Sequence, residues 1–330
     1  MSQPKVAIIG LGLIGSSIGL ALRKAGPDFE IVGHDKDRSV SKKAHKLGAV
    51  EKWEGNLISA VEEAELVIIA TPVVAVRQIL EATGPYLKPD CVVTDTANVK
   101  GQVLEWADEL LPDTTHFVGG HPMIDRSDTD EDDATPDLFV GSTYCLVPSG
   151  TAHPAAIELV TSMVRELGAE PFFLDVTEHD GQVAGVEHLP LMLATALLMT
   201  TSQAPSWRDL QRLPGPAFWR ATQFSSADPA NNRSICLANR ENISRWIALY
   251  IDSLRELQHR LADADDETWE ELFTELMDTR TRWLAGRETP EEEAARAELD
   301  GLRGMRTFGS MFGLTRFRDL RKKLDQRESK

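Results

Sequence analysis

The chain has 330 residues, of which 42% are hydrophobic and 26% charged, as expected for a globular protein of two domains. Its formal net charge of −17 argues against nucleic acid and anionic membrane as partners, because both would repel it. Three scattered cysteines without CxxC spacing predict a reducing, cytoplasmic location. We expect no metal site, because no histidine, cysteine and carboxylate cluster has ligand spacing, and no membrane span, because apolar stretches are too short.

Up to about residue 175, short β-branched runs alternate with segments of helical apolar spacing. The runs predict buried strands over 6–9, 30–33, 66–70, 91–94 and 143–147, with helices over 73–87 and 100–111. Strand–helix repetition of this kind predicts an α/β fold with a doubly wound, Rossmann-type parallel sheet.

Beyond residue 175 the strand pattern stops. Three long segments, 177–203, 231–262 and 266–285, carry apolar residues at helical spacing. We therefore expect one domain over 1–175 and an all-helical domain over 176–330, with a C-terminal tail from about residue 301. The first two segments are too apolar for one small domain to cover, which favours a homodimer through the helical domain.

A glycine-rich turn follows the first predicted strand and opens a helix that runs to about Arg23. The first glycine permits a tight turn, the second lets a pyrophosphate approach the backbone, and the third lets helix and strand pack closely. The free N–H groups at the helix N-terminus then bind the anion. The predicted cofactor contacts here are Gly10, Gly12, Leu13, Ile14 and Gly15.

Asp35 stands twenty residues after Gly15, at the end of the second predicted strand. A carboxylate there accepts hydrogen bonds from the adenosine ribose and repels a 2′-phosphate, so NAD is the predicted cofactor. The alternative is an acid that merely ends a strand. Thr71 and Pro72, after the strand 66–70, are expected to form the next wall of the same crevice.

Four further segments complete a family pattern. They are the stretch 94–101 (TDTANVKG), the stretch 118–123 (VGGHPM), the triplet 178–180 (EHD) and the stretch 187–190 (EHLP). Together with the glycine-rich turn, over residues 4 to about 260, they resemble the prephenate and arogenate dehydrogenase family of tyrosine biosynthesis. The resemblance implies NAD-dependent oxidative decarboxylation of a cyclohexadienyl carboxylate, a substrate site in the helical domain, and a homodimer.

The resemblance also implies residue roles. His121 matches the catalytic histidine that accepts the substrate hydroxyl proton, and an imidazole titrating near neutrality suits that role. A structural histidine capping a loop is the alternative. Asn98 stands where the family usually has a serine that orients the histidine and the hydroxyl, and its amide can also donate and accept hydrogen bonds.

Other matched residues have two interpretations each. His188 is either a histidine of the substrate pocket or a satisfied core residue. His179 and Asp180 either cap or hinge the helical domain or contact substrate. Lys100 either holds the loop at the cofactor edge or is solvated. Asn239 resembles a family asparagine that serves as a structural hydrogen-bond hub.

The chain departs from the family at the predicted substrate site. Gln223 replaces an arginine that binds a substrate carboxylate, and a neutral amide cannot replace a guanidinium. Arg220 or Arg126 could compensate, and Leu191 replaces a histidine. The residues predicted to contact substrate are His188, Gln223, Arg220 and Ser127.

An acidic loop, 125–133, follows the His-Pro-Met element with six acidic residues. It either points to solvent or disfavours the dianion prephenate and favours arogenate, whose ammonium offsets one carboxylate. Two alternatives stay open: a related NAD-dependent dehydrogenase of another hydroxylated carboxylate or ring alcohol, and a non-catalytic NAD-binding protein. Retention of His121 argues against the second.

Overall fold

A computed structural model describes most of the chain. The described ranges are 3–26, 29–124, 134–224, 228–263 and 266–285. They fall into two compact units, one ending at Ile243 and the other beginning at Ser244. The first unit contains the sheet and the helices up to residue 243, so all residues of the candidate site belong to it. The division at 175/176 stays a prediction.

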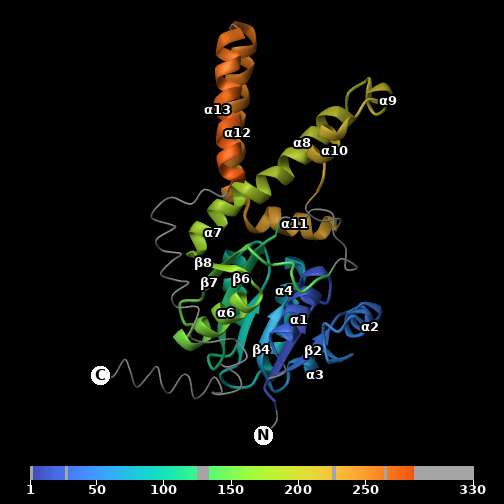
Figure 1. Cartoon of the computed structure of the whole chain (residues 1–330), viewed down its shortest axis with the longest axis vertical. Helices are drawn as coiled ribbons and strands as arrows, with labels where there is room; N and C mark the ends of the chain where they lie inside the picture. Colours follow the sequence, from blue (N-terminus) through green and yellow to red (C-terminus); the bar gives the residue numbers. More distant parts are fainter. Residues whose placement is uncertain (1–2, 27–28, 125–133, 225–227, 264–265, 286–330) are drawn as a thin grey trace, which may run out of the picture. The chain divides into compact units, whose positions relative to one another are not determined.

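One eight-stranded sheet, in the order β3-β2-β1-β4-β5-β6-β7-β8, forms the centre of the first unit (Figure 1). The strands are β1 (Lys5–Ile9), β2 (Glu30–His34), β3 (Lys52–Trp53), β4 (Ala64–Ile69), β5 (Val92–Asp95), β6 (His116–Met123), β7 (Thr143–Pro148) and β8 (Glu170–Phe173). Neighbouring strands are parallel except β6 and β7, which pair antiparallel. The predicted doubly wound, Rossmann-type fold is confirmed, with this one antiparallel pair added.

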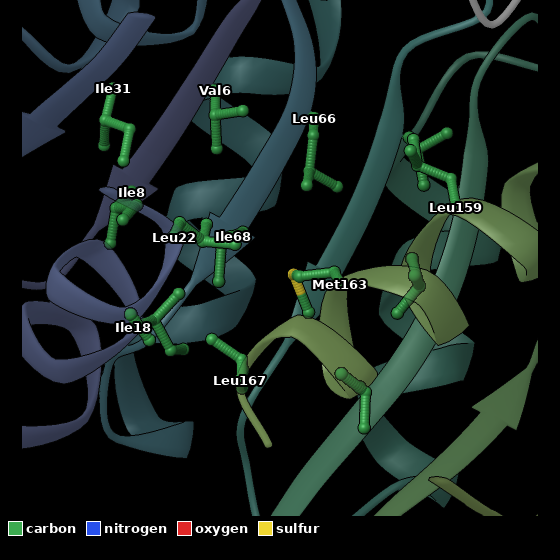
Figure 2. Close-up of a cluster of buried hydrophobic side chains, with 14 of the residues drawn as sticks. Val6, Ile8, Ile18, Leu22, Ile31, Leu66, Ile68, Leu159, Met163 and Leu167 are labelled. Atoms are coloured by element: carbon green, nitrogen blue, oxygen red, sulfur yellow. The ribbon is translucent and has the colours of Figure 1, made fainter. Parts of the chain in front are cut away.

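Helices cover both faces of the sheet. They are α1 (Leu13–Ala25), α2 (Arg38–Leu47), α3 (Leu57–Val61), α4 (Val73–Thr83), the short 3-10 helix η1 (Gly84–Tyr86), α5 (Gly101–Leu110) and α6 (Pro154–Glu166). One face packs against α1, α2 and α6, where Ile8 and Ile68 of the strands meet Ile18 and Met163 of the helices (Figure 2). The other face packs against α3, α4 and α5. Burial on both faces explains why the strands read as continuous apolar runs.

After β8 the described chain is helical, as predicted. The helices are α7 (Val176–Val183), the π-helical turn η3 (Ala184–His188), α8 (Leu189–Ser202), α9 (Trp207–Leu210), α10 (Pro216–Ala221), α11 (Pro229–Ala238), α12 (Arg240–Asp263) and α13 (Asp266–Leu284). Asp175 caps α7 in a reciprocal capping box with Glu178. The N-cap interpretation of His179 and Asp180 is therefore wrong.

The continuous helix Val176–Ser202 is long and apolar enough to cross a membrane, when judged by its length and composition alone. The core helix of a soluble protein passes the same test. This helix carries Asp180 and Glu187 and contributes buried side chains to the candidate site, as described below. One such helix is weak evidence for a membrane span. Only 33% of the tested window is buried, and the buried side chains belong to the part of the helix up to Ala194.

Candidate active site

The glycine-rich turn lies at the carboxyl end of β1, between helices that go to opposite faces of the sheet. This is the switch point at which doubly wound sheets bind dinucleotides. Gly10 has a φ of 91°, and a Cβ on it would lie 2.4 Å from the Ala70 carbonyl oxygen. A Cβ on Gly15 would lie 1.9 Å from the Gly10 carbonyl oxygen. Both positions therefore exclude a side chain.

Gly12 differs from its two neighbours in the motif. A Cβ on it would meet no atom within 4 Å, so this backbone borders open space. It is the N-cap of α1, and no side chain caps that helix end. The first N–H groups of α1, around Leu13 and Ile14, are thus available to a phosphate, which fits a dinucleotide cofactor.

Asp35 connects the end of β2 to the glycine-rich turn. Its Oδ2 accepts a hydrogen bond from the Leu11 amide at 2.9 Å, and its Oδ1 accepts one from the Asp37 amide at 2.9 Å. Each carboxylate oxygen has a second lone pair, which leaves capacity to accept from ribose hydroxyls. Thr71 and Pro72 follow β4 on the other side of the turn, and the methyl carbon of Thr71 would lie 2.7 Å from a Cβ on Gly10. The predicted cofactor residues other than Lys100 therefore gather at one end of the sheet.

His121 lies on β6, with only 4% of its surface exposed, and begins a chain of hydrogen bonds. Its Nδ1 is 3.0 Å from Nε2 of His179, whose Nδ1 is 2.8 Å from Oδ1 of Asp180. A carboxylate only accepts, so Nδ1 of His179 carries the hydrogen and its Nε2 accepts from His121. The Nε2 of neutral His121 therefore holds a lone pair.

Asp180 is the anchor of this chain. Its two carboxylate oxygens accept the backbone N–H groups of Lys100 and Gly101, each at 2.8 Å. Burial alone would raise the pKa of Asp180, but the hydrogen bonds from His179 and these two amides outweigh it and hold the pKa below its usual range. Burial lowers the pKa of His179. The pair is therefore a carboxylate and a neutral imidazole.

Lys100 is fully buried, so the solvated interpretation is wrong. Its Nζ lies 2.5 Å from Oδ2 of Asp95 and 2.7 Å from the Gly120 carbonyl oxygen. The other oxygen of Asp95 accepts the Gly120 amide at 3.1 Å. Lys100 thus ties the end of β5 to β6, next to His121. Contact between Lys100 and the cofactor stays a prediction, because both of these ammonium contacts are with protein.

Glu187 is a site residue whose role the sequence patterns do not predict. Its Oε1 lies 3.4 Å from Nε2 of His121, and its Oε2 accepts from Nδ2 of Asn98 at 3.5 Å. Burial alone would raise the pKa of Glu187, but the hydrogen bond and the positive charge that His121 offers when its Nε2 is protonated outweigh burial and lower the pKa. Glu187 sits in the π-helical turn, a feature often found at functional sites. The sequence feature that marks Glu187 is its position in the stretch 187–190 (EHLP), which is part of the family pattern.

His188 and Asn239 are buried beside this cluster. Nδ2 of Asn239 donates to the Asp180 carbonyl oxygen at 2.8 Å and lies 3.2 Å from Nδ1 of His188, while its Oδ1 accepts from Asn242. Asn239 is therefore the structural hub that the sequence predicts. Burial lowers the pKa of His188 to about 4, so the ring is neutral. Within the described residues its Nε2 has no hydrogen-bond partner.

The remaining predicted substrate residues lie elsewhere. Arg220 in α10 and Gln223 shortly after it have exposed side chains, outside the buried cluster around His121. Leu191 is buried in α8. Ser127, Arg126 and the acidic loop 125–133 lie outside the described residues, as does the tail from residue 301. Substrate contacts by Arg220, Gln223, His188 and Ser127 stay predictions.

Comparison with known proteins gives two family matches that together span most of the chain. Residues 18–172 match the prephenate dehydrogenase nucleotide-binding domain, and residues 175–278 match the prephenate dehydrogenase dimerization domain. A prephenate dehydrogenase of Bacillus subtilis (strain 168) is 32% identical over 277 residues, which are 83% of this chain and 74% of that protein. A cyclohexadienyl dehydrogenase of Zymomonas mobilis is 28% identical, over 83% of this chain and 94% of that protein.

Solved structures agree. The prephenate dehydrogenase of A. aeolicus, in complex with hydroxyphenyl propionate and NAD+, matches with a TM-score of 0.75 and 27% identity, over 86% of this chain and 99% of that one. The arogenate dehydrogenase of Synechocystis matches with a TM-score of 0.67 and 27% identity, over 84% and 98%. The chain therefore belongs to the prephenate dehydrogenase family and is an NAD-dependent dehydrogenase.

Proposed function

We propose that the chain catalyses the oxidative decarboxylation of arogenate or prephenate, with His121 as the proton acceptor. The observation that carries this proposal is the chain from Asp180 through His179 to His121. It leaves the lone pair on Nε2 of His121, the nitrogen beside the partly exposed carboxylate of Glu187. A base in this tautomer can take a hydroxyl proton without rearranging its own hydrogen bonds.

In the proposed reaction, the hydride passes to NAD and His121 accepts the proton, so that atoms and electrons balance. Bound NAD supplies the hydride acceptor for the ring carbon that carries the hydroxyl. Nε2 of His121 takes the hydroxyl proton, the ring carboxylate leaves as CO2, and its bonding electrons complete the aromatic ring. The proton then returns from His121 to the phenolate oxygen. While protonated, His121 lies 3.4 Å from the Glu187 carboxylate and remains bonded through His179 to Asp180, so both acids stabilise the imidazolium.

The names of the relatives support this reaction class and include prephenate, cyclohexadienyl and arogenate dehydrogenases. The test is NADH absorbance from the purified chain at saturating NAD, with prephenate and arogenate offered separately. We expect NADH together with CO2 and a 4-hydroxyphenyl product from at least one of them. Absence of NADH with both, in protein shown to bind NAD, would contradict the proposal.

We further propose a cytoplasmic homodimer. The match to a dimerization domain over residues 175–278 supports the dimer. Both described helices of the second unit also expose large apolar side chains, among them Leu254 of α12 and Met277 of α13. The three cysteines are free thiols, which fits a reducing compartment.

A further inference from the structure

We propose that Glu187 selects a substrate that carries an ammonium group, so that the chain acts on arogenate in preference to prephenate. The inference rests on the function proposed above and assigns a specificity role to a residue of the same site. Glu187 suits this role by its position, its exposure and the charges that surround it.

Glu187 differs from the other acids near His121 because it is open to an incoming molecule. Its side chain is 30% exposed, whereas that of Asp95 is fully buried and that of Asp180 is 11% exposed. Asp95 and Asp180 are bonded to lysine, histidine and backbone donors on both oxygens. The described contacts of Glu187 are longer, at 3.4 and 3.5 Å, and leave room for a better donor.

The described surroundings hold no cation to balance Glu187 in the resting site. The Lys100 ammonium is paired with Asp95. His179 and His188 are neutral because burial lowers the pKa of each. Leu191, one helical turn after Glu187, is apolar and buried. The part of the site that the structure describes is therefore anionic once Glu187 is ionised.

Prephenate and arogenate differ in charge, so an anionic site distinguishes between them. Prephenate carries two carboxylates and a keto group, so a carboxylate in the site repels it and gains no hydrogen bond in return. Arogenate carries an ammonium in place of the keto group, and an ammonium–carboxylate hydrogen bond is about twice as strong as a neutral one. Glu187 therefore favours arogenate by attraction and disfavours prephenate by repulsion.

Glu187 has a competing role as the counterion of protonated His121, and the two roles have different kinetic consequences. A counterion assists proton transfer from either substrate, so its loss lowers kcat for both to a similar extent. A specificity residue changes the ratio of kcat/KM between the substrates. Glu187→Gln removes the charge and keeps the shape of the side chain, which allows the two roles to be separated.

The experiment measures kcat and KM for arogenate and prephenate with the wild type, Glu187→Gln and the control Glu178→Gln. Glu178 lies on the same helix, and glutamine can keep its capping-box bond. We expect the wild type and the control to prefer arogenate. We expect Glu187→Gln to lower the arogenate-to-prephenate ratio of kcat/KM by about tenfold or more, through a higher KM for arogenate.

Each other outcome is informative. A wild type that prefers prephenate, or a Glu187→Gln variant that loses both activities equally, overturns the inference and leaves the proposed function intact. A wild type that oxidises neither substrate contradicts the proposed function itself, and the inference with it. NAD affinity, measured by fluorescence titration of each variant, confirms that the proteins compared are folded.

Discussion

The proton acceptor depends on Asp180, a residue that does not contact it. Asp180→Asn removes the charge that fixes His179 with its hydrogen on Nδ1, and with it the preference for a lone pair on Nε2 of His121. We expect kcat to fall by about 10²-fold or more with little change in KM, by analogy with the loss seen when a catalytic histidine takes the wrong tautomer. Steady-state kinetics test this.

A purely structural role for Asp180 gives a different result. Asp180 also accepts two backbone N–H groups, so the variant will unfold at a lower temperature whichever role is correct. NAD affinity and KM, measured on the folded variant, separate the cases. An unchanged kcat would show that the hydrogen-bond chain does not orient His121.

His188 links the site to the pH dependence of stability. The pKa of His188 is about 4 in the folded protein, against 6.5 for an unperturbed histidine. Between these two pH values, the unfolded chain binds a proton at His188 that the folded chain does not. The free energy of unfolding therefore falls as pH decreases through this range, by about 2 kcal/mol between pH 7 and 5 from this residue. Urea unfolding of the wild type and His188→Gln at both pH values measures it. An equal pH dependence in both proteins would contradict this assignment.

Single site residues were predictable where they belong to a sequence motif, but their hydrogen-bond partners were not. His121 and His188 stand out in the sequence because they match a family pattern, and Asn98 stands out because it replaces the usual serine at a position of that pattern. The bond from His121 to His179 spans 58 positions and that from Lys100 to Asp180 spans 80. Periodicity and local motifs carry no information about such contacts, so the hydrogen-bond chain emerged only from the fold.

Among the elements, the turn between β1 and α1 gives a paired prediction. Gly12→Val places its side chain in open space at an ordinary φ of −68°, so the protein should fold normally. The same side chain occupies the approach of the cofactor phosphates, and we expect NAD affinity to fall by at least about tenfold. Calorimetric titration of the Gly12→Val variant with NAD measures this loss of affinity.

Gly10→Ala should behave in the opposite way. Its positive φ and the Ala70 carbonyl oxygen at 2.4 Å oppose a methyl group, so we expect a loss of about 1–3 kcal/mol in unfolding free energy. Thermal unfolding of the two variants side by side tests the contrast. Equal destabilisation by both would mean that the space at Gly12 is not reserved for a ligand.

The strands that the sequence missed have physical reasons for being missed. β6 carries His121, but Gly119, Gly120 and Pro122 all have low strand propensity, and the strand forms because β5 and β7 pair with it on both sides. β3 has only two residues, too few for a periodic signal. The π-helical turn at Glu187 leaves no trace in the apolar pattern, because one extra residue in a turn does not alter composition.

For the whole molecule, the exposed apolar surface of the second unit predicts self-association. Leu254 and Leu261 of α12 are 48% and 75% exposed in the described part of the chain, and a second copy that covered them would remove this apolar surface from water. The double variant Leu254→Asp and Leu261→Asp should shift a dimer to a monomer in size-exclusion chromatography with light scattering. His259→Asp, which lies on another face of the same helix, is the control. An unchanged mass in the double variant would contradict an interface on the face of Leu254 and Leu261.

The most direct test of His121 as the proton acceptor compares wild type and His121→Gln for NADH formation with arogenate and with prephenate. Removal of a positioned proton acceptor lowers kcat by about 10²–10⁴-fold, and NAD affinity should not change, because His121 lies outside the glycine-rich crevice. That result would establish a dehydrogenase that uses His121 as its base. Turnover by His121→Gln at the wild-type rate would contradict the assignment of the base.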